Sequence, residues 1–139
     1  MKANELLYIS DKKVLVLDDH TMLGHRVAKF ELTRMIFVNV RIAPCEGNPI
    51  ELVEEWKPNL IVLDPDTRPG TRDGFELLRK LKENPATSHI PILVWTDIYK
   101  EDCEEHESYR KGVADYLSKH WGLHLHIKVA EMLKKQDGE

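Results

Sequence analysis

Five short apolar runs, each bounded by turn-forming residues, dominate the hydrophobic pattern of the chain. In order they are VLVLDD (14–19), MIFVNVRIA (35–43), LIVLD (60–64), IPILVWT (90–96) and a weaker run, ADYLSK (114–119). Because their Val, Ile and Leu residues are continuous and do not alternate with polar ones, the runs predict strands that are buried on both faces, as in a parallel sheet.

Segments with helical periodicity separate these runs. The apolar positions that recur at helical spacing are Leu23, Val27 and Phe30, then Leu52, Val53 and Trp56, then Leu77, Leu78 and Leu81, and finally Trp121, Leu125, Val129 and Met132. Asn48 and Asp73 are predicted N-caps, with Pro49 as a first helical residue and Asn84-Pro85 as a helix stop. A polar helix is expected over about 99–112. Since parallel strands need right-handed helical crossovers, this alternation predicts a doubly wound α/β fold with helices on both faces of the sheet.

The composition narrows the functional classes. The 139 residues suffice for one domain with its own core, and 42% hydrophobic and 32% charged residues are ordinary for a globular protein. The net charge of −4 provides no basic surface for nucleic acid, which is therefore not an expected partner. No apolar run approaches the ~20 residues of a membrane span, and the first residues lack the apolar centre of a secretory signal. Cys45 and Cys103 show no metal-binding or redox spacing, which favours a reduced, cytoplasmic setting.

Polar side chains follow four of the predicted strands. Asp18 and Asp19 close the first run, Asp64 the third, Thr96 the fourth and Lys119 the fifth. Taken singly, an aspartate after a strand is most often a turn former or a helix cap, and a lysine there is solvated. In a doubly wound sheet, however, ligands bind outside the carboxyl ends of the strands, so these side chains are expected to meet at one edge.

Such a cluster has a defined chemistry. Carboxylates held close together repel one another unless they share a proton or hold a cation. An all-oxygen set suits Mg²⁺, which takes few protein ligands and keeps several waters. The ammonium of Lys119 and the hydroxyl of Thr96 add positive charge and a donor, which stabilise a dianionic phosphoryl group. A carboxylate can then attack phosphorus and become an acyl phosphate.

The chain resembles a response-regulator receiver domain, the phosphoacceptor module of two-component signalling. The motifs that carry the resemblance are VLVLDDH, NLIVLDPD, DGFELLRKLK, PILVWTD and GVADYLSKH, in the order and at nearly the spacing of the family. The resemblance implies a flavodoxin-like, five-stranded parallel sheet of order 2-1-3-4-5. It divides the chain into an N-terminal extension (1–11), a receiver domain (12–134) and a C-terminal tail (135–139).

The same resemblance implies a role for each site residue. Asp64 is the implied phosphoacceptor, and Thr96 and Lys119 are implied to contact the phosphoryl oxygens. Tyr116 falls where the family keeps an aromatic side chain that swings inward as the switch is thrown. The implied Mg²⁺ ligands are Asp18, through water or as an orienting group, Asp19 directly, Asp64, and the backbone carbonyl of Asp66.

The implied function is that of a single-domain signalling module. A sensor histidine kinase or phosphotransfer protein is expected to donate the phosphoryl group. A downstream protein is expected to bind the face made by the fourth helix, fifth strand and fifth helix, where Tyr99, His106 and Tyr109 are candidate contacts. The module is expected to be a monomer or weak homodimer. It is not expected to be an enzyme beyond phosphorylating itself from small donors and losing the group again.

Three departures from the family pattern leave alternatives open. The loop DPDTRPGTRDG is about two residues longer than usual, Asp97 stands where a small residue is common, and His120 replaces the proline that normally follows the lysine. Asp97 and His120 favour a second hypothesis, a pseudo-receiver that serves as a scaffold without phosphorylation. A third hypothesis is a phosphohydrolase of the haloacid-dehalogenase type, whose Asp-x-Asp signature LDPDT imitates, although that family carries it on the first strand and not the third. His120 and His124 have zinc-binding spacing on a helix but lack a third ligand, so surface histidines are expected.

Overall fold

The computed structural model describes residues 11–18, 32, 39–45, 48–64, 73–96, 113–118 and 124–136. In chain order the elements are β1 (Lys13–Leu17), β2 (Asn39–Ala43), α3 (Pro49–Trp56), β3 (Leu60–Leu63), α4 (Asp73–Glu83), β4 (Ile92–Thr96), β5 (Asp115–Ser118) and α6 (Leu125–Lys135). Strand and helix alternate wherever the structure describes both, as the hydrophobic pattern predicts. None of the helices in these residues is long and apolar enough to cross a bilayer.

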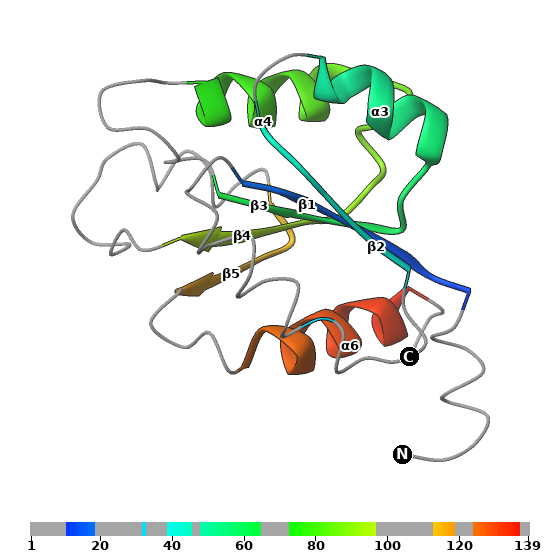
Figure 1. Cartoon of the computed structure of the whole chain (residues 1–139), viewed down its shortest axis with the longest axis vertical. Helices are drawn as coiled ribbons and strands as arrows, with labels where there is room; N and C mark the ends of the chain where they lie inside the picture. Colours follow the sequence, from blue (N-terminus) through cyan, green and yellow to red (C-terminus); the bar gives the residue numbers. More distant parts are fainter. Residues whose placement is uncertain are drawn as a thin grey trace.

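The five strands form one parallel sheet of order β2-β1-β3-β4-β5, which confirms the predicted fold (Figure 1). The central strands β3 and β4 are buried at every position, and β1 at all but its first. This is why their sequences are continuously apolar. β2 and β5 lie at the two edges and have partly exposed residues, which explains the weaker fifth apolar run.

Alternate strand residues pack into two apolar layers. On one face, α3 and α4 cover the sheet and form with it the α3–α4 cluster, whose strand members are Leu15, Leu17, Ile61, Leu63, Ile92 and Val94. On the other face lies the α6 cluster, whose strand members are Val14, Val16, Leu60, Val62, Leu93 and Trp95. Figure 1 shows α3 and α4 on one side of the sheet and α6 on the other. Residues of the predicted helical stripes complete much of the two layers: Leu77, Leu78 and Leu81 are buried in the first cluster, and Leu125, Val129 and Met132 in the second.

The predicted helix boundaries at Asn48 and Asn84 are found, whereas Asp73 is the first residue of α4 and not its N-cap. Asn48 is the N-cap of α3, but its side chain makes no capping bond and instead donates from Nδ2 to Oε2 of Glu51 at 3.2 Å. The helix closes at Lys57, which adopts the left-handed conformation (φ 53°) and donates its N–H to the carbonyl of Val53. α4 ends before Asn84, as its Asn-Pro stop predicts.

Several predictions fall outside the described residues. They concern the helical stripe of Leu23, Val27 and Phe30, the polar helix over about 99–112, and Trp121. The pairing of β2 begins at Asn39, and the earlier part of the predicted run over 35–43 also lies outside.

Candidate functional site

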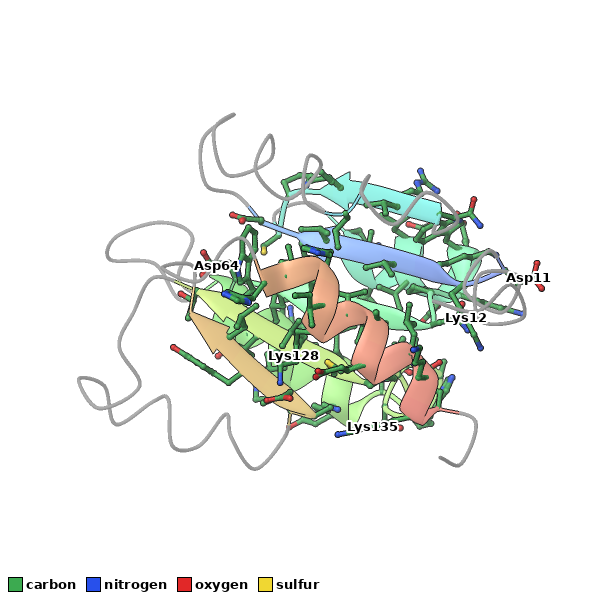
Figure 2. The ribbon with its side chains drawn as sticks, turned by 90° about the horizontal axis from the view of Figure 1, so that it is seen from below. Asp11, Lys12, Asp64, Lys128 and Lys135 are labelled. Carbon is green, nitrogen blue, oxygen red and sulfur yellow. The ribbon has the colours of Figure 1, made fainter. Side chains whose placement is uncertain are left out.

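Three of the predicted site residues are buried polar side chains at the carboxyl edge of the sheet. Asp18 directly follows β1, Asp64 directly follows β3, and Thr96 is the last residue of β4. Their exposed fractions are 0%, 1% and 1%. Figure 2 shows Asp64 at the edge toward which the strands point, whereas Asp11 and Lys12 lie at the opposite edge. Asp18 and Thr96 are 78 positions apart in the sequence, yet both lie at this edge of the sheet.

The backbones of the two aspartates continue the hydrogen-bond ladder of the sheet. The Asp64 N–H donates to the carbonyl of Leu17 at 3.0 Å, and the Asp18 N–H donates to the carbonyl of Ala43 at 3.1 Å. The last paired residues of β1 and β3 are Leu17 and Leu63, so Asp18 and Asp64 occupy the next register position of adjacent strands. Neighbouring strands lie about 4.8 Å apart, so the two main chains are about that far from each other.

This position is the topological switch point of the sheet. From β1 the chain moves outward to the edge strand β2, and then returns to β3 on the other side of β1. In doubly wound sheets the crevice for a ligand opens outside the strands that flank such a reversal. Asp18 and Asp64 end the two flanking strands.

Thr96 and Tyr116 share one face of the sheet beside this point. Tyr116 of β5 pairs with Val94 of β4, two residues before Thr96, and it packs against the α3–α4 cluster. Because side chains two apart on a strand point to the same face, Thr96 lies on the face that Tyr116 occupies. The structure thus places Tyr116 and Thr96 on the same face of neighbouring strands.

The remaining predicted site residues are not among those that the structure describes. They are Asp19, Asp66 and Lys119, together with Asp97 and His120 of the two departures from the family pattern. The longer loop after Asp64 also lies outside, as do the candidate contact residues Tyr99, His106 and Tyr109.

Comparison with known proteins decides the family. The sequence model of one protein family, the response regulator receiver domain, matches residues 14–131 of the chain. The chain belongs to this family. Receiver domains are the signalling phosphoacceptors of two-component systems, and they interact with histidine kinases and with downstream targets.

Individual receivers resemble the chain in sequence and in structure. Response regulator Rcp1 of Synechocystis sp. is 40% identical over 75 residues, which cover 54% of this chain and 49% of Rcp1, so the match spans about half the length of that relative. The solved Mn²⁺-bound form of Rcp1 superimposes with a TM-score of 0.62 and 25% identity, covering 89% of this chain and 92% of that one. The signal receiver domain of a histidine kinase from Syntrophus aciditrophicus superimposes with a TM-score of 0.74 over 92% of this chain and 94% of its own, and at 20% identity it supports the fold alone.

The residues at the edge of this receiver fit a divalent cation of the magnesium type. Asp18 and Asp64 place two carboxylates in a site that is shielded from water, where they repel each other unless a cation or proton compensates them. Hard oxygen ligands in small number are what Mg²⁺ takes from proteins. Among the described residues no group of three or more His, Cys, Asp or Glu side chains could hold a metal, and the predicted ligands Asp19 and Asp66 are not among these residues.

An ion pair links β5 to α6 beside Tyr116. Nζ of Lys128 lies 2.9 Å from Oδ2 of Asp115, and the other carboxylate oxygen accepts the Tyr116 N–H at 2.8 Å (Figure 2 labels Lys128 on α6). Burial alone raises the pKa of Asp115, but the hydrogen bonds from Lys128 and Tyr116, with the charges of Lys128 and Lys135, lower it overall. The hydrogen bond to Asp115 raises the pKa of Lys128 against a smaller opposing effect of burial. Neither residue stands out in the sequence, because the pair joins a strand to a helix 13 positions away.

Sequence reasoning also missed Cys45. This residue follows β2 in the turn after Ala43, is 6% exposed, and directs its Sγ to the carbonyl oxygen of Asp64 at 3.9 Å. The sequence around Cys45 contains no motif that predicts this contact. The contact forms between residues that follow β2 and β3, two strands that are not neighbours in the sheet.

A pocket of about 660 Å³ opens far from this edge. Its lining residues are Val53, Glu54, Lys57, Pro58, Asn59, Ala86, His89, Pro91 and Gln136. Asn59 and Pro91 directly precede β3 and β4, so the pocket lies at the amino edge of the sheet. It is therefore separate from the carboxylates at the carboxyl edge.

Proposed function

We propose that this receiver accepts a phosphoryl group on Asp64 from a histidine kinase or a phosphotransfer protein. One observation carries the proposal: two fully buried carboxylates, Asp18 and Asp64, occupy neighbouring register positions at the switch point of the sheet. What supports a phosphoacceptor that works with a bound metal is their placement, because doubly wound sheets bind ligands at this edge and Mg²⁺ takes hard oxygen ligands.

In the proposed reaction, a carboxylate oxygen of Asp64 attacks phosphorus of the donor. A new O–P bond forms while the bond from phosphorus to the donor's leaving group breaks, and the leaving group takes the electron pair. Asp18, Asp19 and the backbone carbonyl of Asp66 are proposed to hold Mg²⁺ together with Asp64. When bound, the metal neutralises charge on the phosphoryl oxygens. The hydroxyl of Thr96 and the ammonium of Lys119 are proposed to contact those oxygens once the group is transferred.

The proposed output is a change at the face of β5. With Thr96 engaged by the phosphoryl group, Tyr116, which shares its side of the sheet, is proposed to swing inward and so alter the surface that a downstream protein binds. The domain limits at 12 and 134, and a monomeric or weakly dimeric state, are part of the same proposal.

The test is the intact mass of the protein after incubation with Mg²⁺ and a small acyl phosphate donor. We expect one acid-labile phosphoryl adduct on the parent protein, and none on Asp64→Asn or after chelation of the metal. Asp11→Asn is the matched control, because Asp11 is an exposed aspartate at the opposite edge (Figure 2). It should form the adduct at the parental rate.

Other outcomes identify the competing functions. An adduct that persists in Asp64→Asn places the phosphoryl group elsewhere and contradicts the proposal. Continuous turnover of phosphate esters indicates a phosphohydrolase. Failure to form an adduct with any small donor or cognate kinase indicates a scaffold without phosphorylation.

A further inference from the structure

The end of β2 contacts the backbone of both buried aspartates. The carbonyl of Ala43 accepts the Asp18 N–H at 3.1 Å, and two residues later the thiol of Cys45 donates to the carbonyl of Asp64 at 3.9 Å. The second contact is the unexpected one, because β2 and β3 are not neighbours. β1 lies between them, so the two strands are about 10 Å apart. The turn after β2 must therefore reach across the end of β1, where Asp18 lies.

Cys45 is held firmly at the place from which it makes this contact. It is 6% exposed and belongs to the α3–α4 cluster, which also contains Leu17 and Leu63, the residues directly before Asp18 and Asp64. A side chain packed among these neighbours has little freedom to move independently of the two strand ends. Its thiol is a weak donor, so the contact contributes little to the stability of the fold.

The carbonyl that receives the thiol belongs to the peptide bond between Asp64 and Pro65. Pro65 has no N–H, so this peptide group can be fixed by hydrogen bonding only through its oxygen. The N–H of Asp64 is held by the carbonyl of Leu17 at 3.0 Å, so the thiol contact on its carbonyl adds a second restraint on the main chain from which the carboxylate extends. The rate of a reaction depends strongly on the position and orientation of the reacting group, and a displacement of about 1 Å can slow the reaction considerably.

We propose that Cys45 is a positioning residue for phosphoryl transfer: its thiol contacts the Asp64 carbonyl and helps to fix the main chain from which the Asp64 carboxylate reaches the incoming phosphorus. This inference rests on the proposed function of Asp64. Cys45 does not itself touch the phosphoryl group, and no oxidation or other reaction of its sulfur is involved.

The test compares Cys45→Ala with Ile90→Val. Both variants remove atoms from the same apolar cluster, but Ile90, 4% exposed, precedes β4 at the amino edge, far from Asp64. The rate of adduct formation with the small acyl phosphate donor and saturating Mg²⁺ is measured for each, alongside urea unfolding to show that both are folded. We expect Cys45→Ala to be slower by about two- to fivefold, the range that loss of one weak hydrogen bond corresponds to, and Ile90→Val to keep the parental rate.

An infrared measurement reads the contact directly. In a Cys103→Ser background the S–H stretching band belongs to Cys45 alone, and we expect it at the lowered frequency of a hydrogen-bonded thiol. A band at the frequency of a free thiol, or equal rates for Cys45→Ala and Ile90→Val, would overturn the inference while leaving Asp64 as phosphoacceptor. A parent protein that forms no adduct refutes the proposed function, and with it the positioning role, even if the infrared band shows the thiol bound.

Discussion

The ion pair between Asp115 and Lys128 offers a quantitative test of how β5 is attached to α6. Two substitutions remove its charges while preserving much of the shape. Asp115→Asn keeps an oxygen that can accept the Tyr116 N–H, and Lys128→Met keeps an apolar stem against the sheet. With the double variant they form a cycle whose interaction free energy isolates the charge–charge contact.

The structure sets the expected size of that interaction free energy. Two unit charges 2.9 Å apart attract by about 6 kcal/mol at an effective dielectric constant of 20. Most of this is offset, since Lys128 and Asp115 are 28% and 38% exposed and both lose solvation and side-chain freedom. Measured values for comparable pairs are about 0.2–1 kcal/mol, and the second bond of Asp115 to Tyr116 favours the upper half of that range. We therefore expect about 0.5–1 kcal/mol.

Urea unfolding of the four proteins measures this coupling. At an m-value of about 2 kcal/mol/M, the expected coupling corresponds to about 0.25–0.5 M in the unfolding midpoint. The pair Arg79–Glu83 is the matched control, because its atoms are also 2.9 Å apart but the side chains are 53% and 64% exposed. A coupling for Asp115–Lys128 no larger than that of the control pair would refute the reasoning from burial.

The pH dependence of the interaction free energy between Asp115 and Lys128 is a second test of this ion pair. The lowered pKa of Asp115 means that its contribution is complete above the ordinary value of 3.8 and is lost as pH falls through the folded-state pKa. The raised pKa of Lys128 means that its contribution is complete below the ordinary 10.5 and is lost as pH rises through the higher folded-state pKa. The coupling should thus be constant from about pH 5 to 9 and disappear in acid. A coupling that does not weaken as the pH falls through the folded-state pKa of Asp115 would contradict the assignment to these charges.

Two further substitutions test the metal site and the end of α3. Asp18→Asn should raise the Mg²⁺ concentration for half-maximal adduct formation by about tenfold, since it removes one of two buried carboxylates. A Mg²⁺ titration measures this, with Asp11→Asn as the control that should match the parent. If Asp18→Asn also matches the parent, the Asp18 carboxylate is not involved in binding the metal. Lys57→Gly should raise the free energy of unfolding by about 0.5 kcal/mol, because glycine has no Cβ penalty at φ 53°, whereas Lys57→Ala should not, and equal urea midpoints for the two would argue against backbone strain at this position.

The sequence predicts the strands of this fold well because their burial is unusually complete. β3 and β4 are enclosed by helices on both faces, and that environment requires the continuous apolar runs from which they were predicted. The placement of Asp18, Asp64 and Thr96 at one edge follows from the same logic, since all strands of a parallel sheet end on the same side.

The contacts across non-neighbouring strands could not be predicted in this way. Cys45 contacts Asp64 because the turn after β2 crosses the end of β1, and periodicity says nothing about the path of a turn. Asn48 illustrates the same limit at a smaller scale. Its position as an N-cap is predictable, but the choice of its side chain between the helix backbone and the carboxylate of Glu51 depends on local geometry.

The composition of the carboxyl edge is best explained by function and not by folding. Each aspartate continues a strand whose preceding residues, Leu17 and Leu63, are fully buried leucines, and a further apolar residue would be buried there at a gain in free energy. Two carboxylates in the same places instead lose their hydration and repel each other. Both aspartates end strands at the point where the chain reverses direction across the sheet, which is where doubly wound sheets bind their ligands, and this placement is what the proposed phosphoacceptor role requires.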